Sequence, residues 1–239
     1  MTARLRYVAF LTEQPDAMAA FYCERLRFAE MARSSAQDIF LTDGGAKLAL
    51  LRSRQDLGEA RMQIGPHHIG FAVDDFEVIK ARFRRLNPRA LMVPEAGKNR
   101  GEIRLYDPEC NPVSLSRAAF GLGEDRSSES KLRFLAFGAL DPETQADFYI
   151  RVFGLRPLAH EQSAASDLRP DRYVTDGHVV LGFVNYFGPN AGARPRYGLS
   201  RCGFADAAGG AGRVELTDPD GNGIILAQPD GEGIEAWRA

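Results

Sequence analysis

Two adjacent histidines, His67 and His68, stand out in this 239-residue sequence because their side chains could do chemistry. Imidazole binds metal ions and transfers protons near neutral pH. Segment 67–73 is rich in apolar and aromatic residues, which predicts a β-strand. Adjacent strand residues point to opposite faces, so we do not expect the two histidines to form a metal pair. A lone histidine at a strand start is more often a hydrogen-bonding residue than a ligand.

Strand alternation predicts which residues share a face with His68. If the apolar residues of segment 67–73 pack beneath a helix, His68 points to the other face. The residues predicted to line that face with His68 are Tyr7, Arg104, Tyr106 and Ser114. Such a set suits a polar or aromatic small molecule held in a cavity. A partly collapsed, water-filled cleft is the alternative, and the sequence does not decide between them.

These residues lie on elements that occur twice along the chain. Segment 4–10 aligns with segment 131–137 at an offset of 127 positions. The further anchors are Pro15 with Pro142 and Phe21-Tyr22 with Phe148-Tyr149 at the same offset, and Thr42-Asp43-Gly44 with Thr175-Asp176-Gly177 at an offset of 133. Anchors that recur in the same order indicate an internal duplication.

Each copy opens with a strand that is followed by a helix. In the second copy, Asp141 suits the N-cap, Pro142 the first helical position, and Gly154 the left-handed position that ends a helix. A second kind of unit follows each copy: a strand, a helix in the first half, and two closing strands joined by a turn. That turn is Asp107-Pro108-Glu109-Cys110-Asn111 in one half and Asp218-Pro219-Asp220-Gly221-Asn222 in the other. Cys110 stands where the other copy has glycine, and we expect it to be slightly strained.

The fourth unit is too short to hold its helix. His68 and Asp107 are 39 positions apart, whereas the paired residues Arg201 and Asp218 are only 17 apart. Yet the fourth unit alternates as a helix-covered face would, at Cys202, Phe204, Val214, Leu216, Ile224 and Leu226. An uncovered apolar face of this size would favour association or aggregation.

Three explanations for this face are open. A partner subunit covers it, the C-terminal tail with Trp237 covers it, or a segment is missing between Ala205 and Gly212. We favour the last, and expect an irregular stretch between Asp206 and Gly212.

The chain resembles the vicinal oxygen chelate superfamily, which includes glyoxalase I, bleomycin-resistance proteins and extradiol dioxygenases. The resemblance covers nearly the whole chain and rests on order and repetition. Its carriers are the opening strands Tyr7-Val8-Ala9-Phe10 and His68-Ile69-Gly70-Phe71, the helix motifs Phe21-Tyr22 and Phe148-Tyr149-Ile150-Arg151-Val152-Phe153-Gly154-Leu155, and the two Asp-Pro turns. It implies an α+β fold of tandem paired βαβββ modules, the glyoxalase/bleomycin resistance/dihydroxybiphenyl dioxygenase fold. Two cup-shaped domains then hold ligands inside curved sheets.

Enzymes of that family hold a divalent metal in a cup, and the resemblance carries their ligand positions onto this chain. In the first cup these positions are Tyr7, His68, Ala49 and Ser114; in the second they are Phe134, Arg201, Gly182 and Ile225. A catalytic site usually needs about three protein ligands. Only His68 is a good one, so the sequence argues against a metal, unless a residue such as Glu102 joins Tyr7 and His68.

The composition restricts the partners. The formal net charge is −2 and the sequence pI is about 6.1, which argues against nucleic acid or an anionic membrane as partner. No apolar run is long enough to span a bilayer, and the N-terminus lacks a signal peptide's apolar core. Three cysteines without zinc-type spacing fit a reduced, cytoplasmic protein. Whether two copies form a homodimer is left open.

These observations define the expected organisation: a first domain at 1–118, a polar linker at 119–130, and a second domain at 131–230 whose fourth module is abridged. The expected function is binding of a small polar or aromatic molecule in the first cup, without a confident cofactor. The alternative is a metal-dependent dioxygenase or lyase in which His68 helps to bind Fe, Mn, Zn or Ni.

Overall fold

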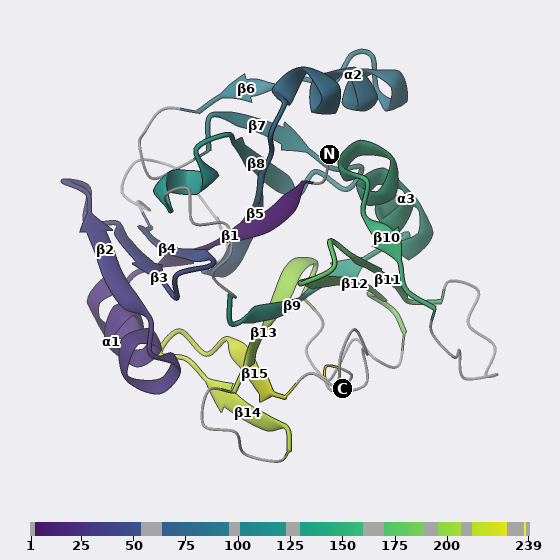
Figure 1. The fold of residues 1–239 in the computed structure, drawn as a ribbon. Helices are drawn as coiled ribbons and strands as arrows, with labels where there is room; N and C mark the ends of the chain where they lie inside the picture. Colours follow the sequence, from purple (N-terminus) through teal and green to yellow (C-terminus); the bar gives the residue numbers. More distant parts are fainter. Residues whose placement is uncertain are drawn as a thin grey trace.

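The computed structural model describes residues 3–53, 64–95, 101–122, 130–159, 170–188, 196–206, 212–228 and 237. Within these ranges the chain forms two mixed sheets and three α-helices (Figure 1). The first sheet has eight strands in the order β2-β3-β4-β1-β5-β8-β7-β6, and the second has seven in the order β10-β11-β12-β9-β13-β15-β14. Each half of the chain therefore builds one sheet.

The elements of the first half are β1 (Arg4–Thr12), α1 (Pro15–Leu26), β2 (Ala29–Arg33), β3 (Ile39–Thr42), β4 (Lys47–Arg52), β5 (Gly65–Ala72), α2 (Phe76–Leu86), β6 (Val93–Pro94), β7 (Ile103–Tyr106), β8 (Pro112–Ser116) and the 3-10 turn η2 (Ala119–Gly121). Those of the second half are β9 (Leu132–Ala139), α3 (Pro142–Phe153), β10 (Arg156–Pro157), β11 (Arg172–Thr175), β12 (Val180–Asn185), β13 (Gly198–Ala205), β14 (Val214–Thr217) and β15 (Gly223–Ala227).

Both sheets place the opening strands of their two modules at the centre. In the first sheet β1 and β5 are antiparallel neighbours, flanked by β4 and β8, which run parallel to them. In the second sheet β9 and β13 form the same antiparallel pair between β12 and β15. This pattern confirms the α+β fold of paired modules, and the central strands supply the floor of each cup.

The helices begin and end at the residues that the sequence indicates. The carboxylate of Asp141 accepts a hydrogen bond from the Thr144 amide at the start of α3, and Gly154 ends that helix at φ 73°. In the first half, Asp75 caps α2 in the same way by accepting from the Glu77 amide. Proline at the first helical position of both α1 and α3 costs no hydrogen bond there.

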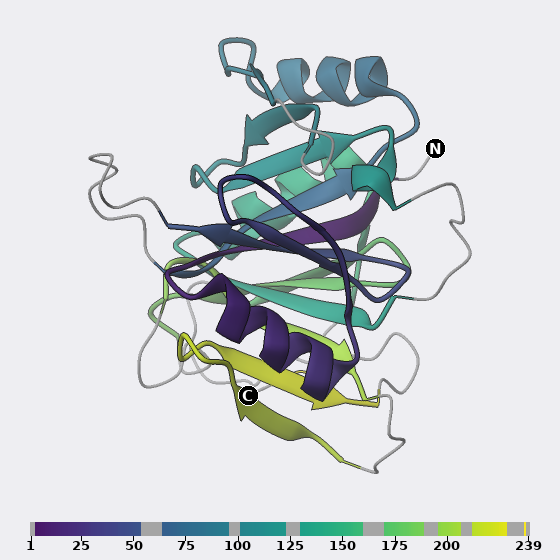
Figure 2. The ribbon, with the colours of Figure 1, turned by 90° about the vertical axis from the view of Figure 1, so that its left-hand side faces the viewer.

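The two halves share one hydrophobic core. Helix α1 packs against the second sheet, where Phe204 of β13 lies 5.7 Å from Phe28 and 6.3 Å from Tyr22, measured between ring centroids. Helix α3 packs against the first sheet, where Phe153 stacks on Phe71 at 4.2 Å. Figure 2 shows α1 beside β15 and β14, close to the strands of the other half. Each of these helices therefore packs on strands of its own half and also contacts the sheet of the opposite half.

The contact of α1 with the second sheet corrects our expectation for the fourth module. Cys202, Phe204 and Ile224 are buried in the shared core, so α1 of the same chain covers this face. None of the three explanations included this arrangement. Trp237 lies on the opposite, cup-side face of the sheet, so the C-terminal explanation is wrong. The irregular stretch predicted between Asp206 and Gly212 falls on residues 207–211, outside the described residues.

The two Asp-Pro turns connect the halves. Tyr149 of α3 donates a hydrogen bond to Asp107 at 3.2 Å, and Tyr22 of α1 donates to Asp218, also at 3.2 Å. Both carboxylates also accept from backbone amides of their own turns, and the pKa of each is raised, chiefly by burial. Cys110 adopts φ 64°, which confirms the strained position expected for it.

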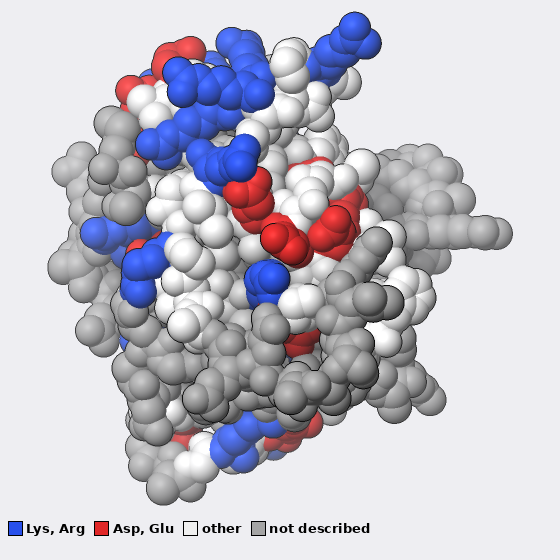
Figure 3. Space-filling model, turned by 90° about the vertical axis from the view of Figure 1, so that its right-hand side faces the viewer, with Lys and Arg blue, Asp and Glu red and all other residues white. Residues whose placement is uncertain are grey.

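Helix α2 lies on the outside of α3. It buries Phe76, Ile79 and Phe83 and ends with Arg84 and Arg85 in its last turn. Lys and Arg side chains gather over this part of the molecule, at the top of the face in Figure 3. Among the described residues, no helix combines the length and apolarity needed to cross a membrane.

Candidate functional site

The first cup is the face of the eight-stranded sheet that lies away from the shared core. Tyr7, Ala9 and Ala49 form an apolar cluster on this face, separate from the main core. Ile69 and Phe71 belong to the main core, so the alternation predicted for β5 is confirmed. The sequence-predicted Tyr7, His68 and Ser114 are all buried here.

His68 lies at the centre of the polar groups in the first cup. Its ring centroid is 5.4 Å from that of Tyr7, and its Nε2 is 3.4 Å from the Nη2 of Arg104. Arginine can only donate, so Nε2 of His68 accepts and its Nδ1 carries the proton. That Nδ1 lies 2.7 Å from the Nδ1 of His67.

The contact between the two histidines corrects the expectation that they point apart. The pairing of β1 with β5 is irregular between Ala9 and Phe10, and His67 has no residue opposite it there. The bulge lets the two rings meet. Burial, with the charges of Arg104 and Arg196 adding to it, lowers the pKa of His67 to about 4. His67 is therefore neutral at pH 7.

Arg104 is held by a carboxylate that the sequence analysis missed. Glu95 forms an ion pair with it at 2.5 Å, and the Glu95 side chain is only 9% exposed. Ser114 lies opposite Arg104 in the pairing of β7 with β8. A Cβ atom on Gly101 would lie 2.4 Å from the Glu95 carboxylate and 2.8 Å from Cβ of Ser114, so a larger residue there would displace these side chains. Sequence alone gives no signal for Glu95, because it follows the two-residue strand β6.

Three buried polar atoms of this cluster have no hydrogen-bond partner within the described parts of the chain. They are Oγ of Ser114, Nε of Arg104 and Oε2 of Glu95. An unsatisfied buried polar atom is costly and calls for an explanation, such as a water or a ligand. The first cup therefore contains unused polar groups next to one another.

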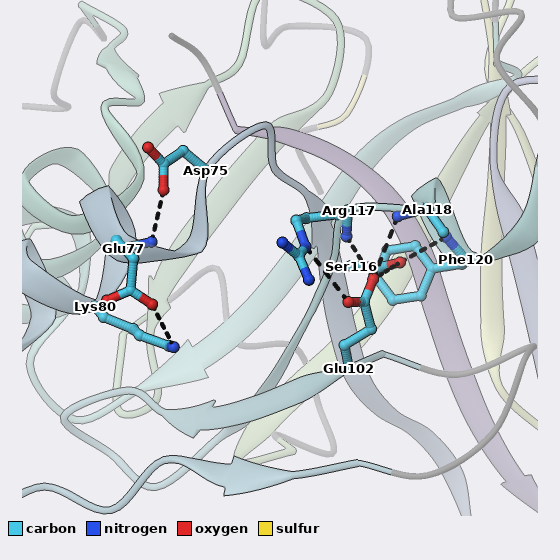
Figure 4. Close-up of polar contacts among 8 residues, drawn as sticks. All are labelled: Asp75, Glu77, Lys80, Glu102, Ser116, Arg117, Ala118 and Phe120. Carbon is cyan, nitrogen blue, oxygen red and sulfur yellow. Dashed lines mark hydrogen bonds and ion pairs between the residues drawn. The ribbon is translucent and has the colours of Figure 1, made fainter.

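Two candidate residues lie apart from this cluster. Tyr106 is at the end of β7, opposite Pro112, and is 40% exposed. No hydrogen bond or ring contact joins it to the other four predicted residues in the described chain. Glu102, considered as an additional metal ligand, instead accepts hydrogen bonds from the amides of Arg117 and Ala118 (Figure 4).

Phe120 fills the first cup. Its buried ring stacks on Tyr7 with centroids 4.6 Å apart and 21° between the planes. A Cβ atom on Gly70 would lie 2.5 Å from the end of the Phe120 ring, so only glycine leaves room for it. The sequence analysis assigned this residue to the linker. Its one signal was a large aromatic residue in an otherwise polar segment.

A hydrogen-bonded turn holds Phe120 in place. Oγ of Ser116 accepts from the Phe120 amide at 3.0 Å, and Glu102 accepts from the Arg117 amide at 2.8 Å (Figure 4). Ala119 and Phe120 both adopt left-handed backbone angles, with φ of 46° and 60°. Two successive non-glycine residues in this region store strain that the surrounding contacts must hold.

Lys47 is a buried cation beneath this turn. Its Nζ donates to the backbone oxygen of Phe120 and lies 5.5 Å from the ring centroid of Phe40. Burial lowers the pKa of Lys47 to about 8. The sequence analysis also missed this residue, although a lysine that opens an apolar strand, before Leu48 and Ala49, was a signal.

The second cup is closed in the same way but is apolar. Trp237 stacks on Phe134 with centroids 5.9 Å apart and 5° between the planes. A Cβ atom on Gly203 would lie 2.7 Å from the Trp237 ring. Phe134 and Gly203 align with Tyr7 and Gly70 of the first cup. In each cup, an aromatic side chain of the protein itself therefore lies against a glycine.

The donor sets do not fit a divalent metal. In the first cup the His68 imidazole accompanies the guanidinium of Arg104, which repels a cation, and the Glu95 carboxylate is already paired with that guanidinium. In the second cup Phe134 and Ile225 cannot bind a metal. No group of three His, Cys, Asp or Glu side chains suited to a metal occurs among the residues described.

Comparison with known proteins agrees with this architecture. Residues 4–113 match the sequence model of the Glyoxalase/Bleomycin resistance protein/Dioxygenase superfamily. The chain therefore has the fold of the vicinal oxygen chelate superfamily, and its first half matches that family in sequence, which confirms the resemblance. A search of curated proteins found no matching sequence.

Solved structures with similar folds include enzymes. The 2,3-dioxygenase LapB from Pseudomonas sp. KL28 has a TM-score of 0.71 at 15% identity, covering 96% of this chain and 93% of LapB. The Mn(II)-bound glyoxalase from Novosphingobium aromaticivorans has a TM-score of 0.69 at 13% identity, with 97% and 86% covered. A 2,2',3-trihydroxybiphenyl 1,2-dioxygenase from Sphingomonas wittichii strain RW1 has a TM-score of 0.66 at 12% identity, with 100% and 95% covered. At these identities the likeness concerns the fold.

Proposed function

We propose that this protein binds a small polar or aromatic molecule in the first cup and needs no metal to do so. The observation that carries the proposal is the cluster of buried, unsatisfied polar atoms on Ser114, Arg104 and Glu95. A ligand that hydrogen-bonds these atoms removes their desolvation cost on binding. The neighbouring rings of Tyr7 and His68 supply an aromatic wall for such a ligand.

The contrast between the two halves supports the choice of cup. The second cup is lined by Phe134, Val180, Ile225 and Trp237, which fill it as an ordinary apolar core. The polar cluster has no counterpart among those side chains. We therefore assign ligand binding to the first half and a structural role to the second.

Metal content tests the alternative of a dioxygenase or lyase. We expect purified protein to hold less than stoichiometric Fe, Mn, Zn or Ni by elemental analysis, and His68→Ala to leave that content unchanged. A stoichiometric metal that His68→Ala removes would contradict the proposal and support a metal-dependent enzyme.

A thermal-shift screen of polar and aromatic small molecules tests binding itself, because a ligand that binds only the folded state raises its stability. We expect hits in buffer containing a chelator, weakened roughly tenfold in affinity by Ser114→Ala, as for one lost hydrogen bond. Ser200→Ala is the matched control, since Ser200 donates to Ala136 in the second half. Hits weakened equally by both changes would argue against the first cup.

A further inference from the structure

We infer that the first cup binds an arylpropanoate, a carboxylic acid joined through two carbons to an aromatic ring, and that Phe120 occupies this ligand's place. The inference rests on the function proposed above and specifies its ligand. It follows from the contacts that the cup makes with the two ends of Phe120, its ring and its backbone oxygen.

The ring end of the site is made for a flat aromatic group. Tyr7 stacks on the Phe120 ring, and Gly70 leaves the space into which the ring tip projects. Ala9 and Ala49, also small, lie beside Tyr7 in the same cluster. A ligand ring replacing that of Phe120 would keep the stacking contact with Tyr7.

At the other end of the site, a buried cation contacts the backbone oxygen of Phe120. Nζ of Lys47 donates to the backbone oxygen of Phe120, which is joined to the ring through Cα and Cβ. The atoms from ring to oxygen are therefore those of 3-phenylpropanoate. An ammonium group binds a carboxylate more strongly than it binds a neutral carbonyl, so the free acid makes the better partner.

A ligand in this place has to displace the segment that carries Phe120. Apart from the contacts with Tyr7 and Lys47, which the ligand would replace, one turn holds the segment through amide hydrogens that Ser116 and Glu102 accept. Ala119 and Phe120 are strained in that turn, and displacement by a ligand releases the strain. We therefore expect Phe120 and the ligand to compete for the same place in the cup.

The second cup provides an internal comparison. Val180 stands beside Phe134 in the position that Lys47 holds beside Tyr7. Trp237 therefore covers a cup with an aromatic platform but with a valine in place of the cation. Opening that cup should create a site for aromatic rings without a preference for acids.

The experiment compares two probes that differ only at the oxygen end: 3-phenylpropanoate and the uncharged 3-phenylpropan-1-ol. Phe120→Ala opens the first cup, and calorimetric titration measures both affinities. We expect the acid to bind at least tenfold more tightly than the alcohol. Lys47→Met, added to Phe120→Ala, should abolish that preference. Trp237→Ala, the matched control, should show no preference for the acid.

A second variant covers the case in which Phe120→Ala does not fold. Glu102→Gln weakens the turn but leaves the ring in the chain, and it should raise the affinity for 3-phenylpropanoate above that of the unaltered protein. Equal binding of acid and alcohol would overturn the arylpropanoate inference while leaving a ligand-binding first cup in place. Absence of acid binding to a folded opened variant would also overturn it, and the screen for other ligands would then decide the proposed function.

Discussion

His67 shows how a single residue links the site to stability. Its pKa is about 4 in the folded protein, against an ordinary value of 6.5. Between pH 4 and pH 6.5 the unfolded chain binds more protons at this residue than the folded protein does. The contribution of His67 to the free energy of unfolding is therefore complete above pH 6.5 and falls as the pH drops towards 4. We expect a loss on the order of 3 kcal/mol from this group, and His67→Gln should make the decline shallower in urea titrations across this range.

His178 contributes in the same direction, because burial also lowers its pKa. His178→Gln should therefore also make the decline of stability with falling pH shallower, and its effect should add to that of His67→Gln. An unchanged pH dependence in the double variant would show that neither imidazole is kept neutral by the fold.

Cys110 carries backbone strain that can be removed. At φ 64° a side chain is disfavoured, and the equivalent Gly221 has φ 84° without that cost. Cys110→Gly should raise the free energy of unfolding by roughly 0.5–1 kcal/mol, measured by urea denaturation. Cys110→Ala, which keeps the Cβ atom, should not. A destabilised glycine variant would show that the thiol contributes more than the strain removes.

At the residue scale, strand alternation predicted part of the candidate site. The phase of β5 puts His68 on the cup face, and simple alternation does the same for Tyr7 and Ser114. Glu95 and Phe120 could not be found in this way, because Glu95 follows a two-residue strand and Phe120 lies in a turn. Their positions depend on tertiary contacts that a periodic pattern does not contain.

At the element scale, the two tyrosine–aspartate hydrogen bonds join each helix to the opposite half. Tyr149→Phe removes the bond to Asp107 and leaves a buried carboxylate with one donor fewer. This change should lower the free energy of unfolding by about 1–3 kcal/mol. Tyr106→Phe, on an exposed side chain, is the control and should have little effect. Equal effects would mean that the hydrogen bond from α3 to the Asp107 turn contributes nothing specific.

The abridged fourth module shows why element contacts were harder to predict than element positions. Alternation at Cys202, Phe204 and Ile224 correctly indicated a buried face. It could not indicate the covering element, because periodicity reports burial but not its partner. The cover is α1, more than 170 positions away in the sequence.

At the scale of the whole molecule, the shared core predicts that the two halves unfold together. Residues of all three described helices and of both sheets belong to one cluster. We expect a single, cooperative thermal transition followed by tryptophan fluorescence and by circular dichroism. Two separate transitions would contradict the shared core.

The first half of the chain, produced alone, gives a second test of the shared core. A chain of residues 1–122 would expose the α1 face that now packs on Phe204, and the Phe71 face that now packs on Phe153. Apolar faces of this kind promote association, so the fragment should aggregate or remain partly unfolded in light scattering and circular dichroism. A monomeric, fully folded fragment would show that the halves are independent. The sequence predicted the duplication and both cups, but not this interdependence.

The central claim is that the first cup binds its ligand through its own side chains without a metal. The most direct test is amide chemical-shift mapping of ligand binding in protein treated with a chelator. We predict shifts at His68, Arg104 and Ser114, and none around Phe134 in the second cup. Binding that requires an added divalent metal, or shifts confined to the second cup, would contradict the account.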